Sequence, residues 1–124
     1  MASILIIDDD DIFRSTLGTS LTSAGHDVTL AANGFDGANA YRAKPADLVL
    51  VDMVMPHSGL ALIEVLRSQF PHLKVIAMSG GSPRRLRHAR ELGAYRTLTK
   101  PFTPEQVANA IAETLAANPE PPTP

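Results

Sequence analysis

The sequence predicts an α/β domain in which a doubly wound, five-stranded parallel sheet carries five helices in a three-layer sandwich. Five short runs rich in apolar and β-branched residues recur along the 124 residues, and segments with helical spacing separate them. At least three of these runs are apolar at consecutive positions, which is typical of strands buried on both faces of a parallel sheet. Strict alternation of strand and helix favours right-handed βαβ units and an open, doubly wound sheet.

The predicted elements follow one another without a break in this pattern. The strands are predicted at residues 3–7, 27–31, 47–51, 74–78 and 96–99. The helices are predicted from apolar stripes that run from Ile12 to Ala24, Phe35 to Tyr41, Leu60 to Phe70, Leu86 to Leu92 and Val107 to Leu115. The last helix has a start signal in which Thr103 caps, Pro104 takes the first position and Gln106 completes a capping box.

Length, net charge and cysteine content exclude several classes of function before any motif is considered. The length suits one domain, which we expect over residues 1–117, followed by the Pro-rich tail NPEPPTP at 118–124. The net charge of −2 gives no general attraction to nucleic acid or to an anionic membrane. The chain has no cysteine, which excludes disulfides, thiol catalysis and cysteine-bound metals. With no signal peptide or membrane-length apolar stretch, the expected location is cytoplasmic.

Chemically reactive side chains follow the predicted strands. Asp8 to Asp11 follow the first strand, Asp52 the third, Ser79 the fourth and Lys100 the fifth. The carboxyl ends of parallel strands meet at one edge of a sheet, so we expect these groups to share one cleft. Crowded carboxylates repel one another unless a cation lies among them, and hard oxygen ligands favour Mg²⁺ or Mn²⁺. Carboxylates, a metal ion, a lysine and a hydroxyl together suit phosphoryl transfer.

Four motifs resemble those of the receiver domain of two-component response regulators. They are IIDDD at 6–10, LVLVDMVMP at 48–56, VIAMSG at 75–80 and LTKPF at 98–102, in the order and near the spacing of that family. The resemblance implies a flavodoxin-like fold and a signalling function. The chain would take a phosphoryl group from a histidine kinase or histidine phosphotransfer protein and change conformation to signal to a downstream protein. It would not be an enzyme beyond catalysing its own phosphorylation and dephosphorylation.

The resemblance assigns roles to individual residues. Asp52 matches the phosphoryl acceptor, Ser79 the switch hydroxyl and Lys100 the lysine that pairs with the phosphoryl group. Asp8, Asp9, Asp52 and the backbone carbonyl of Val54 match the ligands of Mg²⁺. Pro101 matches a proline whose preceding peptide bond is usually cis in the family. Asp10 and Asp11 then remain to start the first helix.

The sequence also departs from the family pattern. The segment between Pro56 and Gly59 is one residue shorter than usual, as is the segment from Ser79 to Gly93. Thr97 stands where the family usually has an aromatic residue.

Other functions remain as alternatives. A phosphatase of the haloacid dehalogenase type would use Asp8 as its nucleophile, but no acidic pair follows Lys100, as that family requires. A receiver that acts by binding alone is a third interpretation. We expect no output domain, no nucleic-acid or membrane partner, and a monomer or weak dimer. The basic run at 84–90 is interpreted as a solvated helix face, with a docking surface for an acidic partner as the alternative.

Overall fold

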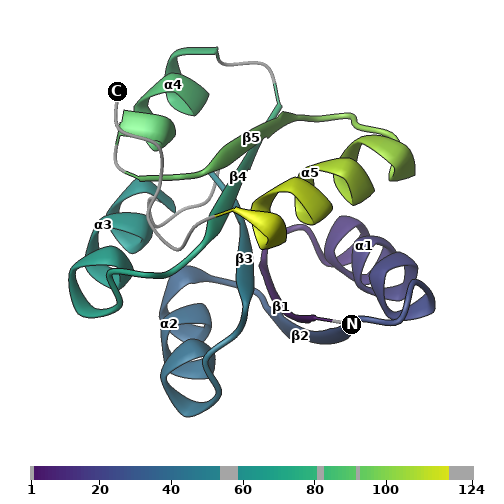
Figure 1. The fold of residues 1–124 in the computed structure, drawn as a ribbon, viewed down its shortest axis with the longest axis horizontal. Coiled ribbons are helices and arrows are strands. Elements are labelled where there is room, and N and C mark those ends of the chain that lie inside the picture. Colours follow the sequence, from purple (N-terminus) through teal and green to yellow (C-terminus); the bar gives the residue numbers. More distant parts are fainter. Residues whose placement is uncertain (1, 54–58, 81–82, 92, 118–124) are drawn as a thin grey trace.

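Five strands and five helices alternate along the chain, as predicted (Figure 1). The computed structural model describes residues 2–53, 59–80, 83–91 and 93–117. The strands are β1 (Ser3–Ile7), β2 (Asp27–Ala31), β3 (Leu48–Asp52), β4 (Val75–Ser79) and β5 (Arg96–Thr99). The helices are α1 (Asp11–Ser23), α2 (Gly34–Ala43), α3 (Gly59–Gln69), α4 (Pro83–Glu91) and α5 (Pro104–Ala116).

The strands form a single parallel sheet in the order β2-β1-β3-β4-β5. This confirms the predicted doubly wound, flavodoxin-like class. The chain runs outward from β1 to β2 and then returns past β1 to β3, so the direction of winding changes between β1 and β3. In open α/β sheets, ligands bind beyond the carboxyl ends of the strands at such a switch point.

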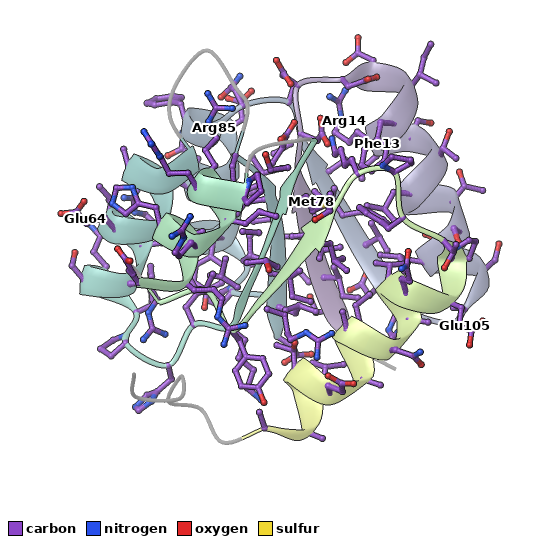
Figure 2. The ribbon with its side chains drawn as sticks, turned by 90° about the horizontal axis from the view of Figure 1, so that it is seen from above. Phe13, Arg14, Glu64, Met78, Arg85 and Glu105 are labelled. Carbon is purple, nitrogen blue, oxygen red and sulfur yellow. The ribbon has the colours of Figure 1, made fainter. Side chains whose placement is uncertain are left out.

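Helices cover both faces of the sheet, which explains why the strands are apolar at consecutive positions. In Figure 1, α1 and α5 lie on one side of the sheet, and α2, α3 and α4 lie on the other. Neighbouring residues of a strand enter different cores: Ile76 and Met78 pack on the α1 and α5 side, whereas Ala77 packs on the other. Met78 lies in the interior with no exposed surface (Figure 2).

Two strands lie one residue further along the chain than predicted. β3 ends at Asp52 and β4 at Ser79, because the hydrogen bonds of the sheet continue to these residues. Met53 N donates to Met78 O at 2.8 Å, and Lys100 N donates to Ser79 O at 2.9 Å. Both polar side chains are therefore attached to the last residue of a rigid strand.

Among the exposed residues of the predicted stripes are two large apolar side chains, Ile12 and Phe35. Ile12 is 81% exposed and Phe35 is 76% exposed, whereas Leu17 and Leu21 of the same first stripe are buried. Ile12 precedes Leu21 by nine residues, or about two and a half helical turns, so the two side chains lie on opposite sides of α1. The prediction that Ile12 and Phe35 belong to the buried faces was wrong.

Helix starts agree with the sequence signals. Thr103 Oγ1 accepts from Gln106 N at 3.0 Å, and Gln106 Oε1 accepts from Thr103 N at 2.8 Å, which confirms the capping box of α5.

The predicted tail at 118–124 lies outside the described residues, so the boundary at 117 stays a prediction. Within the described ranges, no helix combines the length and apolar character needed to cross a membrane. The expected cytoplasmic location also stays a prediction.

Candidate functional site

Three carboxylates converge at the carboxyl end of the sheet. Asp8 directly follows β1, Asp9 comes next, and Asp52 ends β3, the neighbour of β1. One carboxylate oxygen from each of the three lies within 4.8 Å of the other two. Asp8 has no exposed surface and Asp52 is only 5% exposed, whereas Asp9 is exposed. The parallel sheet therefore brings the predicted carboxylates together, as the switch-point argument requires.

Lys100 reaches this cluster from the carboxyl end of the edge strand β5. Its backbone N–H continues the pairing of β5 with β4 by donating to Ser79 O. Its Nζ lies 2.8 Å from Asp8 Oδ2 and 3.4 Å from Asp52 Oδ2, and its side chain is 20% exposed. The Lys100–Pro101 peptide bond is cis, as the resemblance to the receiver family implies. The buried carboxylates of Asp8 and Asp52 thus share one ammonium group, and the carboxylate of Asp9 lies within 4.8 Å of both.

The four consecutive aspartates form two pairs with different roles. Asp10 caps α1 by accepting from Phe13 N at 3.0 Å, and its own N–H donates to Asp8 Oδ1 at 2.9 Å. Asp11, in the first turn, accepts from Arg14 Nη2 at 2.6 Å. Acidic groups stabilise a helix N-terminus because the backbone N–H groups there are unpaired and the helix dipole is positive. The prediction that Asp10 and Asp11 start the first helix is confirmed.

Arg14 is a site neighbour that the sequence analysis missed. Its Nη1 donates to the backbone carbonyl of Asp8 at 2.7 Å, so a side chain of α1 holds the end of β1 in place (Figure 2). An arginine that binds a backbone carbonyl has no sequence signature. Only its position one turn into the helix, next to the acidic run, could have suggested the contact.

Ser79 lies at the end of β4 with no exposed surface. Among the described residues, its Oγ has no hydrogen-bond partner. A buried hydroxyl without a partner costs about 1–3 kcal/mol, which an oxygen acceptor arriving at the site would recover. Ser79 thus offers an unused donor beside the strand that ends in Asp52.

The donor set fits a divalent hard cation. Oxygen ligands such as carboxylates are those that Mg²⁺ prefers, and it usually keeps several waters in its coordination shell. The close approach of the negative charges of Asp8, Asp9 and Asp52 supplies the electrostatic attraction for a cation. Val54, the predicted carbonyl ligand, lies outside the described residues, as does Pro56 of the shortened segment.

Fold and site together define a class of protein: a doubly wound α/β domain whose switch point carries a carboxylate cluster and a lysine. The sequence model of the response regulator receiver domain matches residues 4–112. The chain belongs to this family, which is a family of signalling modules.

Curated relatives contain this domain as one part of a longer protein. The chain is 32% identical over 122 residues to a DNA-binding transcriptional regulator NtrC of Azospirillum brasilense, covering 97% of the chain and 25% of the relative. It is 34% identical over 117 residues to an NtrC of Rhizobium meliloti, covering 93% of the chain and 24% of the relative. The chain therefore spans about a quarter of the length of these two relatives.

Solved structures of isolated receiver domains match over nearly their whole length. The receiver domain of NtrX from Brucella abortus superposes with a TM-score of 0.89 at 27% identity, covering 93% of this chain and 99% of that one. A response regulator receiver domain protein from Clostridium thermocellum gives a TM-score of 0.87 at 28% identity, covering 93% and 94% of the two chains. The fold of this chain is thus that of a receiver domain throughout its matched length.

Proposed function

We propose that this chain is the phosphoacceptor of a two-component phosphorelay and takes a phosphoryl group onto Asp52 from a histidine kinase or a histidine phosphotransfer protein. The observation that carries this proposal is the convergence of Asp52 with Asp8, Asp9 and Lys100 at one sheet edge in a receiver fold. A carboxylate at the end of a rigid strand is well placed to act as a nucleophile, since its approach to an incoming phosphorus atom is fixed.

The transfer is a displacement at phosphorus. A carboxylate oxygen of Asp52 attacks the phosphorus of the phosphohistidine, the P–N bond breaks, and its electron pair stays on the imidazole nitrogen. Asp8, Asp9, Asp52 and the backbone carbonyl of Val54 would hold Mg²⁺, whose charge would neutralise the phosphoryl oxygens. Lys100, already 3.4 Å from Asp52 Oδ2, pairs its ammonium with one of the same oxygens.

Ser79 supplies the conformational response in this proposal. Its hydroxyl, which has no partner among the described residues, donates to a phosphoryl oxygen on Asp52. The new hydrogen bond removes an unfavourable buried donor, so it draws the end of β4 toward the phosphoryl group. α4 begins at Pro83, four residues after Ser79, and moves with that segment. Thr97 is half-buried, and the switch proposed here does not require an aromatic residue at that position.

The proposal limits the chain's own catalysis to its phosphorylation and dephosphorylation. Its partners are a phosphohistidine protein and a downstream protein, without nucleic acid or membrane, and the chain acts in the cytoplasm as a monomer or weak dimer. The two NtrC relatives are described by name as DNA-binding regulators. This chain spans only about a quarter of their length, so DNA binding is not part of the proposal for this chain.

Intact mass spectrometry tests the acceptor directly. We expect wild-type protein incubated with phosphoramidate and Mg²⁺ to gain one phosphoryl group, and EDTA to prevent it. Asp52→Asn should abolish the adduct. Asp11→Asn is the matched control, because that carboxylate belongs to the same acidic run but accepts from Arg14 at the start of α1.

Other outcomes separate the alternatives. An adduct that survives Asp52→Asn but disappears in Asp8→Asn would support the haloacid dehalogenase-type phosphatase. No adduct with any small phosphoryl donor or phosphohistidine protein would support a receiver that acts by binding alone.

A further inference from the structure

The ammonium group of Lys100 has an aromatic neighbour in addition to its two carboxylates. Its Nζ lies 3.9 Å from the centre of the Phe13 ring, over the ring face. The same Nζ lies 2.8 Å from Asp8 Oδ2 and 3.4 Å from Asp52 Oδ2. A cation within about 6 Å of a ring centre is attracted by the negative potential of the ring face, and the attraction grows as water is excluded.

Two parts of the chain hold the Phe13 ring in this position. Its backbone N–H is bound by the capping side chain of Asp10, which fixes the first turn of α1. Its ring meets Phe102 edge to face, with ring centres 5.7 Å apart and an angle of 85°. Phe102 follows Lys100 by two residues, so the segment that carries the lysine also contacts the Phe13 ring.

An aromatic face restrains an ammonium group differently from a carboxylate. A carboxylate fixes the direction of an N–H donor, whereas a ring face attracts the charge without accepting a directed hydrogen bond. Lys100 is closer to Asp8 than to Asp52, and it must shift toward Asp52 to pair with a phosphoryl oxygen there. A ring face therefore attracts the ammonium without fixing it on either carboxylate.

We propose that Phe13 is a positioning residue for phosphorylation, holding the ammonium of Lys100 at the acceptor site through a cation–π contact. This inference rests on the proposed function. A competing explanation is that Phe13 only fills space, since it also packs at the edge of the core that α1 and α5 share. Packing depends on ring size, whereas a cation–π contact depends on the electron density of the ring face.

Stepwise fluorination of the ring separates the two explanations. Fluorine withdraws electron density from the ring face and changes its size little, so each added fluorine weakens attraction for a cation. We expect the rate of adduct formation with phosphoramidate and saturating Mg²⁺ to fall progressively with fluorination. Phe13→Leu should be slower by about three- to tenfold, and Phe13→Tyr should keep most of the wild-type rate.

Phe70 provides the matched control. It is a partly buried ring on the opposite face of the sheet, stacked edge to face on Tyr41 at 4.8 Å, and its fluorination should leave the rate unchanged. A second measurement needs no phosphoryl donor and no metal. In NMR spectra of metal-free protein, the ε-methylene protons of Lys100 should be shifted upfield by the ring, and Phe13→Leu should remove that shift.

Each result decides between the explanations. An unchanged rate across the fluorinated series would overturn the positioning role, while the adduct itself would still support the proposed function. A Lys100 signal unaffected by Phe13→Leu would contradict the contact itself. A wild-type protein that takes no phosphoryl group would contradict the proposed function, and the positioning role with it.

Discussion

Replacing Lys100 by methionine should destabilise the metal-free protein strongly, because it removes the ammonium that faces the carboxylate cluster. Methionine has a similar length and no charge. Asp8 would lose its ammonium contact at 2.8 Å and Asp52 its ammonium contact at 3.4 Å, while both carboxylates stay at the buried end of the sheet. Removing one partner of a buried ion pair leaves the other charge uncompensated, and this is the costly part of the change.

The size of the effect follows from distance and exposure. At an effective dielectric constant of about 20, unit charges at the Asp8–Lys100 separation of 2.8 Å attract by about 6 kcal/mol. Lys100 is 20% exposed, so water replaces part of this attraction. Truncation of one buried partner costs about 3–5 kcal/mol, and with this exposure we expect a loss of about 2–4 kcal/mol in the free energy of unfolding.

Urea unfolding followed by circular dichroism measures the loss, first in EDTA and then in Mg²⁺. Mg²⁺ should stabilise Lys100→Met more than wild type, since a divalent cation takes over the role of the missing ammonium. Lys44→Met is the control: Lys44 Nζ lies 2.5 Å from Asp27 Oδ2, but the two side chains are 62% and 56% exposed. Loss of such an exposed pair should cost less than about 1 kcal/mol.

Equal stability of Lys100→Met and Lys44→Met in EDTA would contradict this prediction. Equal stabilisation of wild type and Lys100→Met by Mg²⁺ would contradict it as well. Either result would mean that the carboxylates are compensated by groups other than this lysine.

Three further variants test the packing around the sheet. Gly37→Ala in α2 should lower the free energy of unfolding by about 1–3 kcal/mol in urea titrations, because a Cβ there would lie 2.4 Å from Ile7 Cδ1 in a fully buried core. Gly18→Ala in α1 should instead be neutral or stabilising by up to about 1 kcal/mol, because its nearest neighbour at 3.0 Å is the side chain of Leu30, which is 45% exposed and can move; a loss as large as that of Gly37→Ala would contradict this difference. Burial raises the pKa of Tyr41 above its usual 10.0, so above about pH 10 the unfolded chain loses this proton before the folded one and stability falls as pH rises. Tyr41→Phe should show a smaller alkaline loss in urea titrations at pH 8 and pH 10.5, and equal slopes for both proteins would count against the shift.

Local sequence signals predicted the elements because those signals act over a few residues. The capping box of Thr103 and Gln106 has the predicted geometry, and Asp10 caps α1. Consecutive apolar positions correctly indicated strands covered on both faces. The same signals failed at Ile12 and Phe35, where an apolar residue stands beside a buried stripe without belonging to it. Apolar character alone does not say which side of a helix meets the sheet.

The site was predictable as a set of residue types at strand ends. Parallel strands place their carboxyl ends at one edge, so the convergence of Asp8, Asp9 and Asp52 follows from a fold class that the sequence indicates. Arg14 and Phe13 were missed as site neighbours. Arg14 contacts the backbone carbonyl of Asp8, and Phe13 contacts the ammonium group of Lys100, which is distant in the sequence.

The α/β class, the elements and the chemical groups at the strand ends can be predicted from the sequence, because periodicity and capping are local properties. Which of these groups meet depends on the order of the strands in the folded sheet. Lys100 pairs with Asp8 across 92 positions of sequence, and this pairing depends on the order in which β3 and β4 separate β1 from β5. Strand order is settled by the packing of both faces of the sheet at once, so no single stretch of the chain encodes it.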